Sequence, residues 1–271
     1  MKVLLTNDDG ITAPGLHAMR RALLEVPDVE LEVIAPDSNR SATARSITTR
    51  RPLWVEEVEF GDGTSGFATD GTPVDCVRFA HLGLIQSPPE LIVSGINHGS
   101  NLGDDITYSG TVAAALEGVV LGIPAIAVSQ QAEDAGMSYH HEGQFDFDAV
   151  AAFAARIVDE LDDFPLPAET LLNINGPAGE VRGAQVTCLG KRRYNDQLQL
   201  EEEDPAGRRR YRIYGMEPGY DHQEGSDLTA VHDGYISVTP IHFDLTDVSG
   251  MRELSAFDFD RLLEPAAREI D

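Results

Sequence analysis

Short apolar runs alternate with longer segments of helical periodicity along the first two thirds of the chain. The apolar run at 3–5 is followed by apolar residues at roughly helical spacing between Pro14 and Pro27, and a second strand pattern covers 30–34. A strand, a helix and a strand over so short a distance predict a βαβ unit with a right-handed crossover and parallel strands.

The same alternation continues beyond this unit. Helical periodicity and short apolar runs predict helices over 72–84, 111–121 and 147–161, and strands over 91–93, 125–129 and 171–175. These elements favour an α/β class fold, a Rossmann-like doubly wound and mostly parallel sheet.

The pattern changes after residue 190. An acidic run at 201–204 meets Pro205-Ala206-Gly207, and an arginine-rich run follows at 208–212. We expect a projecting β-hairpin at about 194–214, with its turn near Ala206-Gly207. The predicted domains are therefore a catalytic core, 1–190, and a C-terminal region, 191–271, which holds the hairpin and a further strand at about 234–241.

The charge of the chain is strongly acidic. With 42% hydrophobic residues over 271 positions the chain can bury a large core, but 46 Asp and Glu oppose 20 Lys and Arg, for a net charge of −26. Because the acids are spread along the chain, we interpret them as the surface of a salt-adapted, halophilic protein; an ordinary acidic mesophilic enzyme is the alternative. Binding to a nucleic-acid duplex is disfavoured, since it needs clustered basic residues.

The cysteines and the hydropathy bear on the compartment. Cys76 and Cys188 lack metal-ligand spacing and are predicted to lie in the core, without a disulfide. No secretory signal precedes the first strand, and no apolar run approaches the roughly 18 residues that span a bilayer. We expect a cytoplasmic protein without a membrane partner.

Two carboxylates follow the first strand. The sequence Asn7-Asp8-Asp9-Gly10 comes directly after the run at 3–5. The carboxyl end of a strand borders the ligand crevice in an open α/β sheet, and adjacent aspartates repel each other unless a cation or a proton lies between them. Asp8 and Asp9 therefore read as ligands of a hard metal ion; a solvated Asx turn with Gly10 at positive φ is the alternative.

A second polar element follows the strand at 91–93. The segment 94–103 contains Asn97 and Asn101, and Ser109-Gly110-Thr111 then opens an alanine-rich helix. A helix N-terminus binds anions through its unpaired N–H groups and its dipole, so these residues predict a phosphate pocket. A simple N-cap by Ser109 or Thr111 is the alternative.

Arginines gather in one segment of this acidic chain. Residues 38–55 contain no Asp or Glu, and a guanidinium can bridge phosphate oxygens, so Arg40 is a candidate phosphate contact. Pairing with surface acids is an equal alternative for Arg50 and Arg51. The arginines of the segment are Arg40, Arg45, Arg50 and Arg51.

These motifs resemble the SurE family, the survival-protein-E nucleotidases. The resemblance rests on Asn-Asp-Asp-Gly at 7–10, Ala-Pro-Asp-Ser-Asn-Arg-Ser at 35–41, Asp-Gly-Thr-Pro-Val-Asp-Cys-Val at 70–77, the segments 94–103 and 108–111, and Gly-Tyr-Ile-Ser-Val-Thr-Pro-Ile at 234–241. It implies a metal-dependent phosphomonoesterase, a 5′/3′-nucleotidase, that hydrolyses nucleoside monophosphates to nucleoside and phosphate.

The resemblance also implies ligands and an assembly. Asp8, Asp9, Ser41 and Asn97 are the implied ligands of one divalent ion per subunit, most readily Mg²⁺ or Mn²⁺. A homodimer or homotetramer is implied, formed through the hairpin and a C-terminal arm at about 243–271. The chain departs from the family pattern at Ser38 and at His98, which we expect to be an exposed loop residue.

The expected mechanism is attack by a metal-activated water. No nucleophile and base stand together in the sequence, so the catalytic residues are expected to be Asp8 and Asp9, with Asn7 and Asp9 positioning the water. A haloacid-dehalogenase-type phosphatase needs Asp-x-Asp after its first strand, where this chain has Asn7. A non-catalytic nucleotide-binding module is disfavoured because Gly-x-Gly-x-x-Gly is missing from the first strand-to-helix turn.

Overall fold

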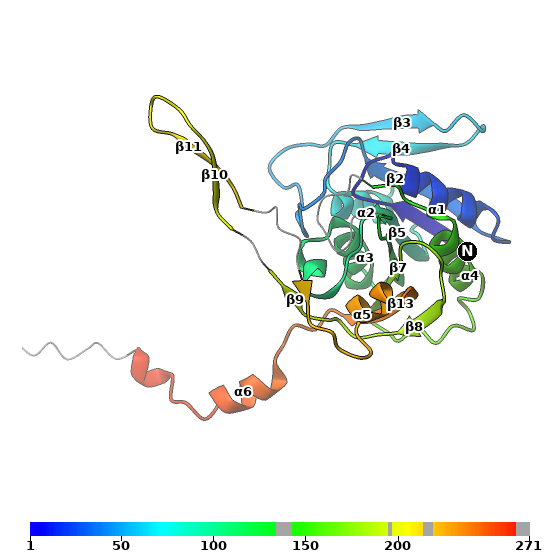
Figure 1. Ribbon diagram of the computed structural model, residues 1–271. Helices are drawn as coiled ribbons and strands as arrows, with labels where there is room; N and C mark the ends of the chain where they lie inside the picture. Colours follow the sequence, from blue (N-terminus) through cyan, green and yellow to red (C-terminus); the bar gives the residue numbers. More distant parts are fainter. Residues whose placement is uncertain (134–142, 195–196, 214–218, 264–271) are drawn as a thin grey trace, which may run out of the picture.

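The computed structural model describes residues 1–133, 143–194, 197–213 and 219–263 (Figure 1). The strands of its main sheet are β1 (Lys2–Thr6), β2 (Glu30–Pro36), β3 (Val55–Glu59), β4 (Ser65–Thr69), β5 (Leu91–His98), β6 (Ala125–Gln130), β7 (Thr170–Gly176), β8 (Gly183–Val186) and β13 (Tyr235–His242). Across the sheet their order is β3-β4-β2-β1-β5-β6-β7-β13-β8. Neighbours run parallel except in the β3–β4 and β7–β13 pairs, which confirms the predicted Rossmann-like α/β fold.

Helices cover both faces of this sheet. Buried apolar residues of α1 (Pro14–Leu24) and α4 (Asp148–Asp159), such as Leu16 and Val150, belong to one hydrophobic cluster. Others of α2 (Pro73–His81) and α3 (Gly110–Val120), such as Val77 and Val112, belong to a second cluster. A short fifth helix, α5 (Asp227–His232), packs against β13. No helix in the described part of the chain is both long enough and apolar enough to span a membrane.

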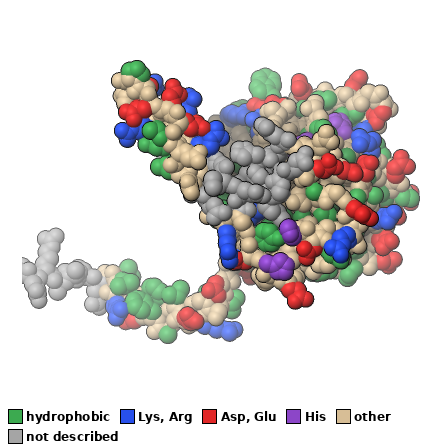
Figure 2. Space-filling model, in the orientation of Figure 1, with side chains coloured by type: hydrophobic (Ala, Val, Ile, Leu, Met, Phe, Trp, Pro, Cys, Tyr) green, Lys and Arg blue, Asp and Glu red, His purple; other side chains and the backbone are tan. Residues whose placement is uncertain are grey.

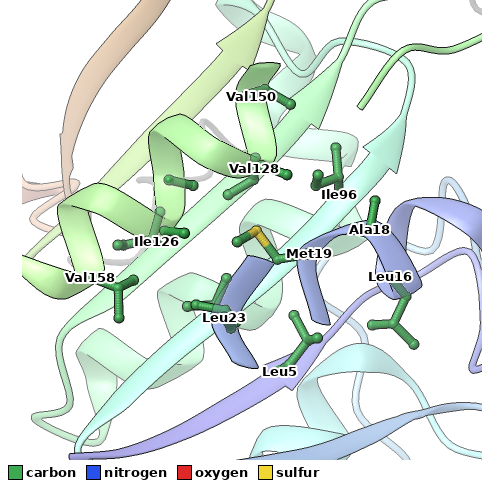
Figure 3. Close-up of a cluster of buried hydrophobic side chains, with 14 of the residues drawn as sticks. Leu5, Leu16, Ala18, Met19, Leu23, Ile96, Ile126, Val128, Val150 and Val158 are labelled. Atoms are coloured by element: carbon green, nitrogen blue, oxygen red, sulfur yellow. The ribbon is translucent and has the colours of Figure 1, made fainter. Parts of the chain in front are cut away.

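Strand β1 is covered on both faces, which explains why the run at 3–5 is apolar throughout. Leu5 packs with Leu16 and Met19 of α1 in the first cluster (Figure 3), whereas Leu4 lies in the second cluster with Val112 of α3. Successive side chains of a strand point to opposite faces, so a strand covered on both faces needs apolar residues at every position.

The order of the strands creates a switch point at the centre of the sheet. From β1 the chain moves outward to β2 and on to β3 at the edge, comes back to β4, and then crosses to β5 on the other side of β1. In open α/β sheets the ligand crevice lies at such a reversal, outside the carboxyl ends of the strands. Predicted site residues follow β1 and β2 and lie at the end of β5 at this point.

A hairpin stands away from the body of the protein (Figure 1). β10 (Gln199–Glu203) and β11 (Arg209–Arg212) pair antiparallel, and Gly207 lies in the connecting turn, as predicted. Exposed ion pairs such as Arg209–Glu203, at 2.7 Å, cross the hairpin, and Figure 2 shows both charges along it. Residues 195–196 and Tyr214 of the predicted hairpin lie outside the described residues.

The chain after β13 forms an arm. It carries α6 (Val248–Leu254) and the 3-10 turn η2 (Asp260–Leu262), in neither of which a residue is buried (Figure 1). The predicted arm at 243–271 is described as far as residue 263. Although it belongs to the predicted C-terminal region, β13 lies inside the main sheet between β7 and β8; the domain boundary at residue 190 stays a prediction.

The fold differs from the sequence analysis in several places. The hairpin of β3 and β4 was not predicted, because β3 is rich in glutamate and half exposed and carries little apolar signal. Strand β5 continues to His98, so Asn97 lies on a strand and not on a loop. Cys188 is exposed, whereas Cys76 is buried as expected.

Candidate active site

Three loops meet at the carboxyl ends of β1, β2 and β5. The backbone N–H of Arg40, after β2, donates to the carbonyl oxygen of Asp8 at 2.7 Å. The backbone N–H of His98, at the end of β5, donates to Oδ2 of Asp9 at 3.0 Å. The switch point thus brings together side chains that are up to about ninety residues apart, as the strand-end rule predicts.

The N-terminus of α3 covers Asp8. The Thr111 hydroxyl donates to Oδ1 of Asp8 at 2.5 Å, and the Ser109 hydroxyl caps the helix by accepting from the N–H of Val112 at 3.0 Å. A Cβ on Gly110 would lie only 2.8 Å from Oδ2 of Asp8. The N-cap that the sequence left open is therefore real, and it places the helix end directly against the carboxylate.

The two carboxylates carry the charge of the site. Asp8 is only 3% exposed, and Asp9 is half-buried. Burial, reinforced by the charge of Asp9, raises the pKa of Asp8 to about 6, against hydrogen bonds from Thr111 and Gly110 that favour the charged form. Burial also raises the pKa of Asp9. A divalent cation relieves both the desolvation and the repulsion, so the pair fits a metal ion.

The two other predicted metal ligands, Asn97 and Ser41, lie at the end of β5 and in the loop after β2. Asn97 is buried, and its Nδ2 donates to the carbonyl oxygen of Gly99 at 2.7 Å. Ser41 is exposed, and its N–H donates to Oδ1 of Asn39 at 2.8 Å, while Nδ2 of Asn39 reaches Oδ1 of Asp9 at 3.3 Å. The sequence analysis missed Asn39, which links the Ser41 loop to Asp9.

The donor set indicates which ion would fit. Among the residues that the structure describes, no group of three or more His, Cys, Asp and Glu could hold a metal. A cation beside Asp8 and Asp9 would thus complete its shell with hydroxyl, amide and water oxygens. Mg²⁺ and Mn²⁺ accept oxygen ligands, and Mg²⁺ retains water readily.

Asn7 shapes the turn that presents the carboxylates. Its Nδ2 donates to the carbonyl oxygen of Gly10 at 3.0 Å, and its Oδ1 accepts from the N–H of Gly10 at 3.2 Å. Gly10 has φ +110°, a conformation that favours glycine. The Asx-type turn and the paired carboxylates therefore coexist, and the fully buried Asn7 contributes through the turn.

His98 is half-buried at the end of β5, which corrects the expectation of an exposed loop histidine. Its Nε2 accepts from the N–H of Gly15 at 3.2 Å, at the start of α1. Its ring stacks on Phe145 and Phe147, with centroids 5.1 and 5.3 Å away. Burial lowers the pKa of His98, which favours the neutral imidazole that accepts this bond. It ties α1 to the end of β5.

Asn101 is held by amides from the neighbouring strands. Its N–H donates to Oδ1 of Asn175 at 2.8 Å, and its carbonyl oxygen accepts from Nδ2 of Asn173 at 2.8 Å. Its own Nδ2 donates to the Ser129 hydroxyl at 2.8 Å. The loop before η1 (Gly103–Tyr108) is thus fixed to the ends of β6 and β7.

Three of the arginines in 38–55 have acidic partners. Arg40 pairs with Asp37 at 2.9 Å, and Arg51 pairs with Asp70, as the alternative for Arg51 predicted. Arg45 pairs with the buried Glu117 of α3 at 2.8 Å. Arg40 is close to the site through its backbone, and its guanidinium would need to leave Asp37 to contact a phosphate.

The raised pKa predicts that Asp8→Asn stabilises the metal-free protein. The fold raises the pKa of Asp8 from 3.8 to about 6, so its charge destabilises the protein above about pH 6, and this cost vanishes below about pH 4. Asparagine carries no charge, so at about pH 7.5 the free energy of unfolding should rise by up to about 3 kcal/mol.

Urea unfolding of chelator-treated protein at about pH 7.5 and about pH 4 measures this difference. Asp148→Asn, which removes an exposed carboxylate in the first turn of α4, is the control. A stabilisation of equal size at both pH values would contradict the assignment of the effect to the Asp8 charge.

The fold and the site together define a Rossmann-like α/β protein with an acidic strand-end site beneath a helix N-terminus. The family model described as "Survival protein SurE" matches residues 3–196. The chain belongs to the SurE family.

Individual relatives are similar over nearly the full chain. The "5'-nucleotidase SurE" of Rubrobacter xylanophilus is 50% identical over 268 residues, which cover 97% of this chain and 99% of that protein. The "5'-nucleotidase SurE" of Geobacter sulfurreducens is 46% identical over 261 residues, 95% of this chain and 94% of that protein. The solved SurE protein from Aquifex aeolicus matches with a TM-score of 0.78 at 38% identity, covering 94% of this chain and 99% of that one.

Proposed function

We propose that this chain is a metal-dependent phosphomonoesterase that hydrolyses nucleoside 5′- or 3′-monophosphates to nucleoside and phosphate. The relatives named 5'-nucleotidase SurE support the substrate class. The observation that carries the proposal is the contact of Asp8 with the N-terminus of α3, because it places a metal-type carboxylate beside an anion-binding helix end.

Asp8, Asp9, Ser41 and Asn97 would hold one divalent ion per subunit, Mg²⁺ or Mn²⁺. When bound, such an ion supplies Lewis-acid polarisation of a phosphoryl oxygen and lowers the pKa of a coordinated water. Thr111 orients Asp8 by donating to it, while the N–H of His98 and the amide of Asn39 orient Asp9.

The phosphate would lie against the start of α3. Ser109, Gly110 and Thr111 would offer N–H groups and hydroxyls at the helix end, where negative charge is stabilised. Asn101 and Arg40 are the further proposed contacts, from the loop before η1 and from the loop after β2. The N–H groups and hydroxyls of this helix end are fixed before substrate binds, so they would stabilise the negative charge that develops on the phosphoryl oxygens.

The first test is phosphate release from a panel of nucleoside 5′- and 3′-monophosphates, with Mg²⁺, Mn²⁺ or chelator. We expect release that needs the metal and depends on a nucleoside monophosphate. An enzyme with full activity after chelator treatment, or one that only binds nucleotides, would contradict the proposal. The panel also determines the preference for base and for phosphate position.

Water, and no protein side chain, is expected to attack phosphorus. The haloacid-dehalogenase-type rival is less favoured, since Asn7, at the place of a phosphatase nucleophile, has its side chain bonded to Gly10. Hydrolysis of a chiral phosphate ester should therefore invert the configuration at phosphorus. Retention would indicate a covalent phospho-enzyme, as in the haloacid-dehalogenase-type route.

High salt should raise both activity and stability. A net charge of −26 repels itself and an anionic substrate at low ionic strength, whereas at about 1 M salt the Debye length is roughly 3 Å and only short contacts persist. Turnover and melting temperature of the metal-loaded enzyme should rise from about 0.05 to about 3 M KCl. If both were highest at the dilute end, the salt-adapted interpretation would be wrong.

Assembly and location complete the proposal. The arm exposes apolar residues that have no cover in a single subunit, among them Leu245, which is 86% exposed, and Leu254, which is 60% exposed. Together with the hairpin, this supports a homodimer or homotetramer, which light scattering in molar salt would detect. A cytoplasmic location stays a prediction from the sequence.

A further inference from the structure

A buried carboxylate from the C-terminal region joins two distant loops. Asp227, the first residue of α5, is fully buried. Its Oδ2 accepts from the N–H of Gly103 at 2.8 Å, and its Oδ1 accepts from the N–H groups of Gly190 and Leu228, each at 2.8 Å. Gly103 opens η1, and Gly190 leads into the base of the projecting hairpin. One side chain therefore fixes both segments.

The backbones of Gly103 and Gly190 lie close together at this junction, and the side chains of Asp227 and Leu228 pack beside them. A Cβ on Gly103 would lie 2.7 Å from the carbonyl oxygen of Gly190, and a Cβ on Gly190 would lie 2.8 Å from Cδ1 of Leu228. The contact between Gly103 and Gly190 involves backbone atoms, which cannot move aside by a change of rotamer. A displacement of one segment is therefore expected to displace the other.

An ion pair strengthens the same connection. Arg192 lies on the short strand β9 (Arg192–Arg193), which pairs with β12 (Gly219–Tyr220), and its Nε is 2.5 Å from Oδ2 of Asp105 in η1. Both side chains are nearly inaccessible, at 3% and 8%. The Tyr194 hydroxyl also donates to Asp105, at 3.0 Å. Loss of one partner of such a pair leaves an uncompensated buried charge.

The connected segment ends in the candidate active site. Residues 103–108 of η1 lead directly to Ser109, whose hydroxyl caps α3, and the helix start bonds to Asp8 through Thr111. The orientation of η1 therefore sets where the helix N-terminus meets the carboxylates. The amides around Asn101 fix only the other end of this loop.

We propose that Asp227 and Arg192 are positioning residues for the phosphate-binding turn, Ser109-Gly110-Thr111, and that they couple this turn to the base of the hairpin. The proposal rests on the proposed phosphomonoesterase function. Neither residue touches the proposed substrate; each acts through η1. Displacement of a binding group by about 1 Å can lower turnover by about 10²-fold, so small shifts of η1 are sufficient.

The test compares neighbouring arginines of the same strand. Arg192→Gln removes the buried pair, whereas Arg193→Gln removes the exposed pair between Arg193 and Asp221, in which the arginine is 69% exposed. Asp227→Asn keeps the shape of the junction but turns one acceptor into a donor. Turnover is measured with saturating Mn²⁺, at a temperature where circular dichroism shows each variant fully folded.

We expect Arg192→Gln and Asp227→Asn to lower kcat at least about tenfold, and Arg193→Gln to stay within about twofold of wild type. Arg192→Lys, which keeps the charge, should recover part of the loss. A purely structural role would lower the melting temperature and leave kcat of the folded enzyme unchanged. Folded Arg192→Gln and Asp227→Asn variants with wild-type kcat would overturn the proposal.

Amide hydrogen exchange gives a readout without turnover. Exchange in 99–111 should accelerate in Arg192→Gln and Asp227→Asn but not in Arg193→Gln, and unchanged exchange there in folded variants would contradict the coupling. Should the variants not fold, the wild-type protein still decides: the N–H groups of Gly103 and Gly190 should be protected and open together. If the wild type releases no phosphate, the proposed function fails, while the exchange data still test the coupling.

Discussion

Replacing Asp8 or Asp9 with asparagine should lower phosphate release on the order of 10³-fold, with the fold intact. Asp8 accepts a hydrogen bond from the N-terminus of α3, and Asp9 accepts one from the end of β5. An amide lacks the charge that holds a divalent ion and the phosphoryl group it polarises. The side-chain shape and the bond from Thr111 can persist, so the loss arises from the charge.

The measurement is kcat over a range of Mn²⁺ concentrations, together with calorimetric titration of the metal. Both variants should bind Mn²⁺ much more weakly, and circular dichroism should show a native fold. Asp148→Asn serves as the control for loss of one carboxylate at a helix N-terminus outside the site. Full activity of both variants in the presence of chelator would contradict the assignment of Asp8 and Asp9 as metal ligands.

Gly110→Ala is the second change with a large expected effect. A methyl group on Gly110 would lie 2.8 Å from both Cβ and Oδ2 of Asp8, closer than side-chain carbons approach other atoms. Alanine favours the helix itself, so the substitution should stabilise α3 while it displaces Asp8. We expect kcat to fall about 10²-fold or more at saturating metal, because a shift of about 1 Å at the site is enough.

Gly118→Ala in the same helix is the matched control. Its Cβ would lie 2.8 Å from Cγ1 of Ile92, so it crowds the core and not the site. It should lower the melting temperature and leave kcat of the folded enzyme near the wild-type value. A Gly110→Ala enzyme within about threefold of wild-type kcat would refute close contact between Asp8 and α3 during turnover.

Much of the fold was predictable from local patterns. The strands at 3–5 and 125–129 were found as continuous apolar runs, because both of their faces are buried. The strand at 30–34 was found by its alternation and the helix at 147–161 by its period of 3.6 residues. The hairpin β3–β4 was not predicted, because the exposed glutamates of β3 follow neither the strand period of two nor the helix period of 3.6 residues. Likewise, nothing local showed that β5 continues to His98, where Ser, Gly and Asn are buried by neighbouring strands.

The candidate active site was likewise predictable only in part. The sequence by itself determined that Asp8, Asp9 and the start of α3 belong to strand and helix ends, because turn and capping residues mark such ends locally. Only the tertiary structure decided that Asn39 reaches Asp9, that Arg40 pairs with Asp37, and that Asp227 bonds to Gly103. The last of these bonds joins residues 124 positions apart, and a contact at that separation depends on how α5 packs against β13 of the sheet, which no local periodicity encodes.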